Sequence, residues 1–268
     1  MTRSRRGLSV EDDASWIFNR MATVYDARPA YPSELIDALA ALAGPTASRI
    51  ADLGAGTGHL TLPLAGRGFQ LTAVEPARQM LARLGQSASE RALQVRAEHA
   101  AAEALPFENG SFDLVLIADA LHFLDVELAA REIRRVLVPR GVLALVTCEL
   151  SPTPFMRALV RLMEDSAPRR PRALAARAAQ LFSIAHTEVR EELGFRDETL
   201  LSQEELERVL DSISFIGPAM NPVRTAAFRE RVRALDLPVR WARTFRLSWG
   251  RRRRTAPVPS TQAGSSRV

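Results

Sequence analysis

The sequence contains no lysine, because all 36 of its basic residues are arginines. No phosphate-loop lysine, Schiff-base lysine or lysine general base is therefore available to it. The net charge of +5 depends on Arg251–Arg254, without which 32 basic residues face 31 acidic ones. A role in binding nucleic acid or membranes would thus rest on that short run alone.

Cysteine is almost as scarce, since Cys148 is the single example. One cysteine excludes an internal disulfide and a zinc site built from several cysteines. No two of the four histidines have metal-ligand spacing, so we expect no metal. Cys148 ends an apolar run that begins at Val142, which favours a small buried side chain over a nucleophile.

Long apolar stretches are also missing. No run of about 18 apolar residues occurs, which argues against a membrane span. The first ten residues are basic and polar without an apolar centre, unlike a secretory signal, so we expect a cytoplasmic protein. The 268 residues, 47% of them apolar, suffice for one large α/β domain with a modest cap.

Short apolar strands alternate with helices between Ile50 and Cys148, a pattern typical of a parallel, doubly wound sheet. Two helices precede it, over 13–24 and 33–43, and Ser33 is expected to cap the second. The expected strands are 49–53, 69–74, 92–95, 112–117 and 142–148, and the helices between them are 59–66, 77–85 and 126–138.

The pattern changes after Ser151. Helices are expected over 154–164, 171–182, 202–210 and 221–235, the third with a capping box of Ser202 and Glu205, and strands over 187–196 and 239–249. The chain then divides into a disordered N-terminus (1–12), a core with N-terminal helices (13–150), a helical cap for the substrate (151–237), a final strand (238–250) and a basic disordered tail (251–268).

A glycine-rich loop, Asp52–Gly58, lies between the first strand of the sheet and the next helix. Glycines let the backbone approach a ligand closely, and the helix presents unpaired N–H groups to the loop. Glu75 ends the second strand, 19 residues after Gly56. An acidic side chain there can accept hydrogen bonds from both hydroxyls of a ribose.

The spacing of the glycines distinguishes two cofactors. A dinucleotide site has the pattern G-x-G-x-x-G, whereas Gly54–Gly58 reads G-x-G-x-G. Asp52 precedes the loop directly and would repel a pyrophosphate. S-adenosylmethionine carries a sulfonium and an ammonium and no phosphate, so the loop favours it over a nicotinamide dinucleotide.

Four stretches, Ile50–Leu60, Ala73–Leu81, Ala102–Val115 and Glu132–Gly141, carry a family resemblance. They resemble the class I S-adenosylmethionine-dependent methyltransferases, in particular the small-molecule group of the ubiquinone/menaquinone biosynthesis type (type 11). The resemblance implies a Rossmann-like, seven-stranded, mostly parallel sheet with an antiparallel last strand and a helical cap. The family often has an acidic residue at the position of Ala101, where it can bond the adenine amine.

The resemblance also implies roles for single residues. The glycine loop would hold the methionine part, Glu75 the ribose, and Ala102 and Glu103 would flank the adenine. Tyr25 and Arg28 belong to a segment that is either a lid over the cofactor or a surface turn ordered by proline. The residues expected to bind the cofactor are Tyr25, Arg28, Asp52, Gly54, Ala55, Gly56, Thr57, Gly58, Glu75, Pro76, Ala102, Glu103 and Asp119.

Methyl transfer to a nucleophile requires positioning more than a catalytic side chain. His122 is the best candidate for a base, although a packing role is the favoured interpretation. We therefore predict an S-adenosylmethionine-dependent methyltransferase acting on an unidentified small molecule. An RNA methyltransferase that uses the basic tail, and a non-catalytic protein of this fold, remain alternatives, and the oligomeric state is not indicated.

Overall fold

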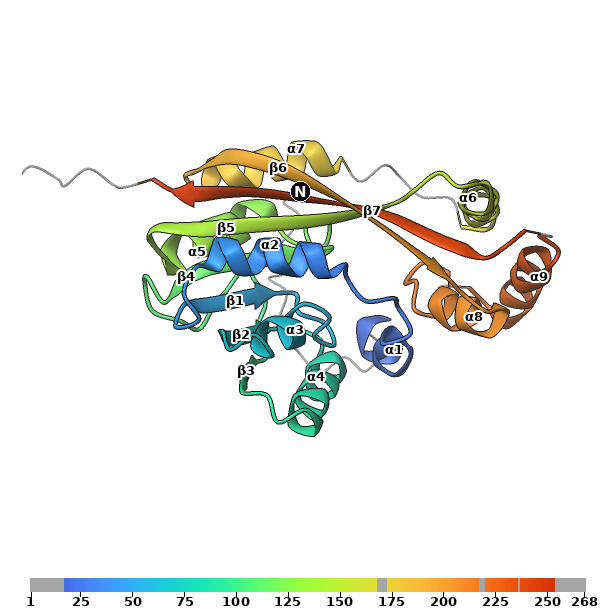
Figure 1. The fold of residues 1–268 in the computed structure, drawn as a ribbon, viewed down its shortest axis with the longest axis horizontal. Coiled ribbons are helices and arrows are strands. Elements are labelled where there is room, and N and C mark those ends of the chain that lie inside the picture. The colour runs from blue at the N-terminus through green and yellow to red at the C-terminus, as the bar shows by residue number, and fades with distance from the viewer. Residues whose placement is uncertain (1–16, 168–172, 217–219, 236, 254–268) are drawn as a thin grey trace, which may run out of the picture.

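The computed structural model describes residues 17–167, 173–216, 220–235 and 237–253. One seven-stranded sheet runs through it in the order β3-β2-β1-β4-β5-β7-β6 (Figure 1). β1 to β5 are parallel, and β7 is antiparallel to both of its neighbours, so the expected fold is confirmed. The strands are β1 (Arg49–Leu53), β2 (Gln70–Val74), β3 (Val95–Glu98), β4 (Phe112–Ala118), β5 (Leu137–Leu150), β6 (Thr187–Leu200) and β7 (Arg240–Arg252).

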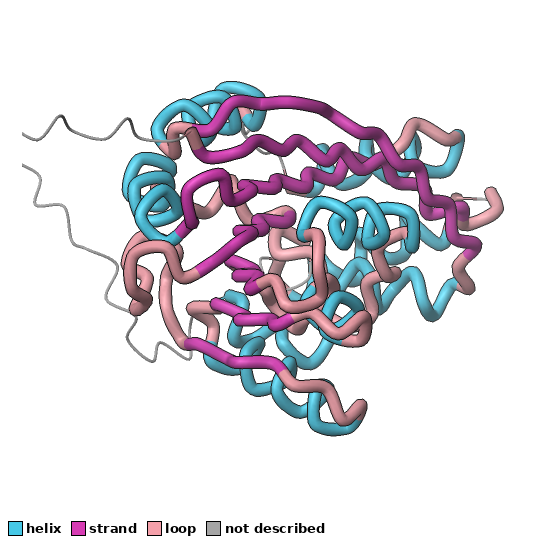
Figure 2. The backbone as a smooth tube through the Cα atoms, turned by 60° about the vertical axis from the view of Figure 1, so that its left-hand side comes forward, coloured by secondary structure: helices cyan, strands magenta, loops and turns pink. Residues whose placement is uncertain are grey.

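Helices cover both faces of this sheet (Figure 2). They are α1 (Ile17–Tyr25), α2 (Ser33–Ala43), α3 (Thr61–Ala65), α4 (Arg78–Glu90), α5 (Val126–Val136), α6 (Pro154–Ser166), α7 (Leu174–Ile184), α8 (Gln203–Asp211) and α9 (Pro222–Arg233).

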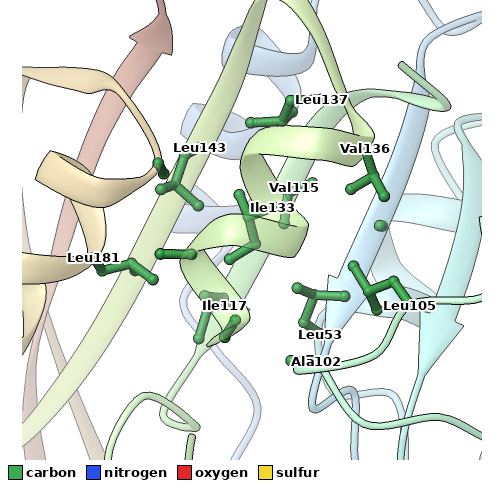
Figure 3. Close-up of a cluster of buried hydrophobic side chains, with 14 of the residues drawn as sticks. Leu53, Ala102, Leu105, Val115, Ile117, Ile133, Val136, Leu137, Leu143 and Leu181 are labelled. Atoms are coloured by element: carbon green, nitrogen blue, oxygen red, sulfur yellow. The ribbon is translucent and has the colours of Figure 1, made fainter. Parts of the chain in front are cut away.

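The central strand β4 shows why the sheet is covered on two sides. Leu114 and Leu116 pack in the cluster that contains α2 and α3, whereas Val115 and Ile117 pack in the cluster that contains α5 and α7. Figure 3 shows Ile133 of α5 beside Val115 and Ile117. A strand buried on both faces is apolar at almost every position, which explains the unbroken run in the sequence.

The stretch expected as a helical cap divides into two parts in the structure. α6, α8 and α9 share an apolar cluster with Trp241 at the start of β7, beyond the carboxyl end of β5 (Figure 1). In contrast, α7 packs its Leu181 and Phe182 into the cluster of α5, and β6 is the edge strand of the main sheet. We refer to α6, α8 and α9 as the cap.

Several expected boundaries were wrong. β3 begins at Val95 rather than 92, and α4 continues to Glu90 rather than ending at 85. Ser33 does not cap α2, because Pro32 occupies the cap position and the Ser33 hydroxyl donates to Glu34. The capping box of Ser202 and Glu205 is confirmed.

The basic tail was expected to begin at Arg251, but β7 continues to Arg252. Arg251 pairs with Val142 of β5 and with Glu188 of β6, so the sheet itself orders this part of the run. The expected disordered stretches 1–12 and 254–268 lie outside the described residues.

β6 and β7 approach each other closely at Gly250. A Cβ atom at this position would overlap the backbone carbonyl of Glu188, beside an irregular register in β6. We expect Gly250→Ala to lower the free energy of unfolding by about 1–3 kcal/mol, because the two strands must separate. Urea unfolding measures this change. The control is Gly194→Ala in β6, where a Cβ meets open space, and equal losses in both variants would contradict the close contact.

Candidate active site

The loop between β1 and α3 needs glycine at more than one position. Gly54, Gly56 and Gly58 have φ angles of 74°, 57° and 94°, which L side chains rarely adopt. A Cβ on Gly54 would also lie 2.8 Å from the Cβ of Ala120 in the loop after β4. The Gly54 amide donates to the carbonyl of Val74 over 2.8 Å, so the loop is held between the ends of β2 and β4.

Asp52 lies just before this loop in β1 and is 2% exposed. Its Oδ2 accepts a hydrogen bond of 2.6 Å from the Thr61 hydroxyl. Burial raises the pKa of Asp52 to about 6, although the hydrogen bond from Thr61 acts in the opposite direction. A carboxyl group is thus held, poorly hydrated, at the carboxyl end of the strand.

Glu75 is the second buried carboxyl group, 6% exposed at the end of β2. Its Oε2 accepts from the Gly56 amide over 2.9 Å, and its Oε1 accepts from the Ala77 amide over 2.8 Å. Burial raises the pKa of Glu75 to about 7, against the effect of these two hydrogen bonds. In the described part of the chain, neither Asp52 nor Glu75 forms an ion pair.

A cavity of about 270 Å³ opens beside the glycine loop. Its walls come from the loop, from the segment Tyr25–Tyr31, from the loop after β4, from the ends of β5 and β7, and from the cap. Eight of the residues that the sequence singled out meet here, namely Tyr25, Arg28, Asp52, Gly54, Ala55, Gly56, Asp119 and His122.

Thr57 and Gly58, at the end of the glycine loop, lie outside the cavity and contact neighbouring side chains. The Thr57 hydroxyl lies 3.3 Å from Nδ1 of His59. A Cβ on Gly58 would come within 3.0 Å of the side chains of Leu62 and Leu84, so this glycine allows close packing of helices. Neither Thr57 nor Gly58 lines the cavity.

Pro76, expected to bind the cofactor, and Ala102 and Glu103, expected near adenine, also lie outside the cavity. The carbonyl oxygen of Pro76 is 3.0 Å from Nε2 of His99. Ala102 is 5% exposed and packs in the apolar cluster of Figure 3. The Glu103 carboxylate accepts from the Asp125 amide over 2.7 Å, at the start of α5. The side chains of Ala102 and Glu103 therefore have structural contacts of their own, as does the Pro76 carbonyl.

The segment Tyr25–Tyr31 covers the glycine loop. A Cβ on Gly56 would lie 3.5 Å from the ring of Tyr25. The Arg28 guanidinium lies 4.1 Å from the centre of that ring and donates to the Tyr25 hydroxyl over 3.0 Å. Arg28 also donates to the hydroxyl and the carbonyl of Ser212, over 3.2 and 2.6 Å, and so links the segment to the end of α8.

Arg243 of β7 is a site residue that the sequence reasoning missed. It lines the cavity although it is only 7% exposed. Its guanidinium pairs with Asp197 of β6 and donates to the carbonyls of Pro29 and Ala30 over 2.9 and 2.6 Å. The alternating pattern of β7 could have indicated Arg243, because it places this one charged residue on a strand face that otherwise carries Trp241, Phe245 and Leu247.

The described residues contain no group of three or more His, Cys, Asp or Glu side chains arranged to hold a metal ion. None of their helices is both long enough and apolar enough to cross a membrane.

The chain matches a family model described as a methyltransferase domain over residues 51–145. An uncharacterised methyltransferase of Schizosaccharomyces pombe is 32% identical over 195 residues, which cover 71% of this chain and 75% of that protein. The chain belongs to the methyltransferase family. The class I assignment made from its motifs is thereby confirmed.

Other relatives of this methyltransferase match a shorter region. An uncharacterised methyltransferase of Mycobacterium tuberculosis is 41% identical over 147 residues, 54% of this chain and 55% of that protein. A demethylmenaquinone methyltransferase of Thermus thermophilus is 44% identical over 109 residues, 40% of this chain and 49% of that protein. The chain thus spans only about half the length of these two relatives.

Solved structures with the same fold are distant in sequence. YcgJ of Bacillus subtilis has a TM-score of 0.58 at 21% identity, covering 84% of this chain and all of that chain. The cyclase SpnF has a TM-score of 0.58 at 20% identity, covering 90% and 93%. Since a protein named as a cyclase shares the fold, the fold by itself does not determine the reaction.

Glu75 makes stability depend on pH. Its pKa is raised from 4.5 to about 7, so between these values the folded protein binds the proton more tightly than the unfolded chain. This contribution to stability is present at low pH and is lost as the pH rises through about 7, by up to ~3 kcal/mol. We expect Glu75→Gln to flatten the pH dependence of the free energy of unfolding, measured in urea between about pH 5 and 7.5.

Glu132→Gln is the matched control. The hydrogen bond from Arg135 lowers the pKa of Glu132, so this carboxylate is ionised in folded and unfolded chains throughout the window. Glu132→Gln therefore leaves the slope unchanged. An unchanged slope in Glu75→Gln would show that Glu75 titrates alike in both states.

Proposed function

We propose that this protein transfers a methyl group from S-adenosylmethionine to a small-molecule acceptor. The observation that carries the proposal is the pair of buried carboxyl groups, Asp52 and Glu75, on either side of a loop of positive-φ glycines. Both lack an ion-pair partner in the described residues. A cationic ligand without phosphate fits this arrangement, whereas a pyrophosphate would be repelled.

Each part of the site has a role in this proposal. Asp52 and the backbone of Gly54–Gly58 bind the amino-acid part of the cofactor, and Glu75 accepts hydrogen bonds from the ribose hydroxyls. Pro76, Ala102 and Glu103 flank the adenine through their backbone. Tyr25 and Arg28 close the segment over the loop, as a lid.

When bound, S-adenosylmethionine supplies a methyl group already activated by a sulfonium. The chain's own contribution is to hold the acceptor in line with that carbon and to exclude water. The segment Tyr25–Tyr31 suits the second task, because Arg28 and Arg243 fasten it to the cap and to the sheet.

The position of the basic run favours a small acceptor over RNA. β7 is antiparallel to β5, so Arg243 lies opposite Leu150 at the cavity, whereas Arg251 lies opposite Val142 at the far edge of the sheet. Arg251 follows Arg243 by eight positions along the strand, a distance of about 27 Å. Arg251–Arg253 therefore do not border the cavity, and an RNA drawn to them would lie away from it.

The names of related proteins point in the same direction. The Thermus thermophilus relative is named a demethylmenaquinone methyltransferase. A geranyl diphosphate methyltransferase solved with sinefungin shares the fold, with a TM-score of 0.51 at 15% identity and coverage of 82% and 78%. Both names refer to small molecules.

Calorimetric titration with S-adenosylhomocysteine tests the cofactor. We expect the wild-type protein to bind it and not NAD. Glu75→Gln should weaken binding by about 10- to 100-fold, because the ribose loses a charged acceptor. Gly56→Arg should abolish binding, since the side chain would enter the loop beneath Tyr25.

The matched control for the arginine is Gly85→Arg, at an exposed position of α4 where a Cβ meets open space. It should bind like the wild type. A folded wild-type protein that does not bind S-adenosylhomocysteine would refute the proposal and leave a non-catalytic role.

A further inference from the structure

The loop after β4 holds a carboxylate in the wall of the cavity. Asp119 has a φ of 50°, a conformation that is uncommon for residues other than glycine but tolerated by Asp and Asn. Its amide donates to the Val146 carbonyl over 3.0 Å. Its Oδ1 accepts from the Cys148 amide over 2.8 Å, and its Oδ2 accepts from the Tyr31 hydroxyl over 3.1 Å. Two hydrogen bonds thus fix the side chain, and a third fixes its backbone, at the carboxyl end of the strand.

Titratable groups from several neighbouring elements act on this carboxylate. Burial raises the pKa of Asp119, while the hydrogen bonds and the guanidinium groups of Arg28 and Arg243 act in the opposite direction. The Cys148 thiol has a pKa raised far above its usual range by burial, and burial likewise raises the pKa of Tyr25 and of Tyr31. The thiol and the two phenols therefore stay protonated. Two imidazoles, those of His59 and His122, also line the cavity, and burial lowers the pKa of His59.

The walls of the cavity on the cap side are mainly apolar. They are formed by Leu150, Met163, Leu174, Val209, Ile213 and Trp241. A molecule placed between these side chains and Asp119 meets carbon on one side and a carboxylate oxygen on the other. Apolar surface gives affinity there, and one polar group fixes the orientation.

We propose that Asp119, which the sequence places among the cofactor-binding residues, instead accepts the proton of a hydroxyl group on an apolar acceptor, and that Tyr31 positions the carboxylate. The inference rests on the proposed function and specifies its substrate class. A bond forms between the hydroxyl oxygen and the methyl carbon, and the carbon–sulfur bond breaks with its electron pair left on sulfur. The hydroxyl proton passes to Oδ2 of Asp119. An acceptor without a proton to lose, such as a tertiary amine, needs no proton acceptor, so Asp119 and Tyr31 would not contribute to its methylation.

A binding experiment separates the hydroxyl from the apolar body. The probes are 2-naphthol and N,N-dimethyl-2-naphthylamine, titrated by fluorescence into protein saturated with S-adenosylhomocysteine. We expect Asp119→Asn to weaken binding of 2-naphthol by about 10-fold or more, since a charged acceptor is lost. Binding of the amine and of S-adenosylhomocysteine should stay unchanged. Asn retains an acceptor for the Cys148 amide and tolerates the positive φ, so the variant should fold.

Asp113→Asn makes the same change at the opposite end of β4, where Asp113 pairs with Arg49, and serves as the control. If the wild-type protein bound 2-naphthol and the amine with equal affinity, the inference that the acceptor carries a hydroxyl group would be overturned. Loss of S-adenosylhomocysteine binding in Asp119→Asn would instead make Asp119 a cofactor residue and would overturn the inference.

Turnover of 2-naphthol identifies the base. The rate should rise with pH as Asp119 deprotonates, and Asp119→Asn should lose this rise and about 10²–10⁴-fold in kcat with no change in KM for S-adenosylmethionine. Tyr31→Phe should move the rise to higher pH, because the Tyr31 hydrogen bond lowers the pKa of Asp119. Loss of the rise in His122→Gln, with the rise kept in Asp119→Asn, would assign the base to His122 and overturn the inference.

A reaction that moves no proton separates this inference from the proposed function. The wild-type protein should form S-adenosylmethionine from S-adenosylhomocysteine and methyl iodide, with iodide leaving, and Asp119→Asn should do so equally well. Formation of S-adenosylmethionine without any methylation of 2-naphthol would overturn the hydroxyl inference and leave the methyltransferase intact. Failure of both reactions, with no S-adenosylhomocysteine bound, would refute the proposed function itself.

Discussion

The candidate active site depends on the interactions of one buried group, the guanidinium of Arg243. A charge that is 7% exposed must be paired or it destabilises the fold by several kcal/mol. Its partners are Asp197 of β6 and the carbonyls of Pro29 and Ala30, which are more than 200 residues away in sequence. The segment that covers the glycine loop is therefore fixed by the last strand of the sheet.

Two kinds of buried charge coexist in this site. Arg243 has a carboxylate partner, whereas among the described residues Asp52 and Glu75 have only neutral hydrogen-bond donors, and burial raises their pKa values. The difference indicates that Arg243 serves the fold, because its interactions are complete without a ligand. The two carboxylates would gain most from a cation, since their burial is compensated only in part.

The sequence predicted the local features best. From periodicity and motif spacing we could infer the succession of strands and helices along the chain, the glycine loop and the two carboxylates, because these features are local in the sequence. The roles of Arg243 and Ser212 could not, since both depend on contacts with a segment far away in the chain. The sequence also did not indicate that β6 lies at the edge of the sheet. An alternating pattern predicts a strand but not the strand with which it pairs.

The direction of β7 determines which of its residues reach the end of the sheet that holds the buried carboxylates. The parallel strands bring their carboxyl ends to one edge, and there Asp52, Glu75 and Asp119 gather from three different strands. An added parallel strand would contribute another carboxyl end, but the antiparallel β7 brings its first residues, Trp241 and Arg243, to the same edge. These residues join the sheet to the cap, so the glycine loop and the apolar walls share one cavity. The cap sequence lies between β5 and β7, apart from the three carboxylates in the chain, and the hydrogen bonds from Arg28 to Ser212 connect it to the segment over the glycine loop.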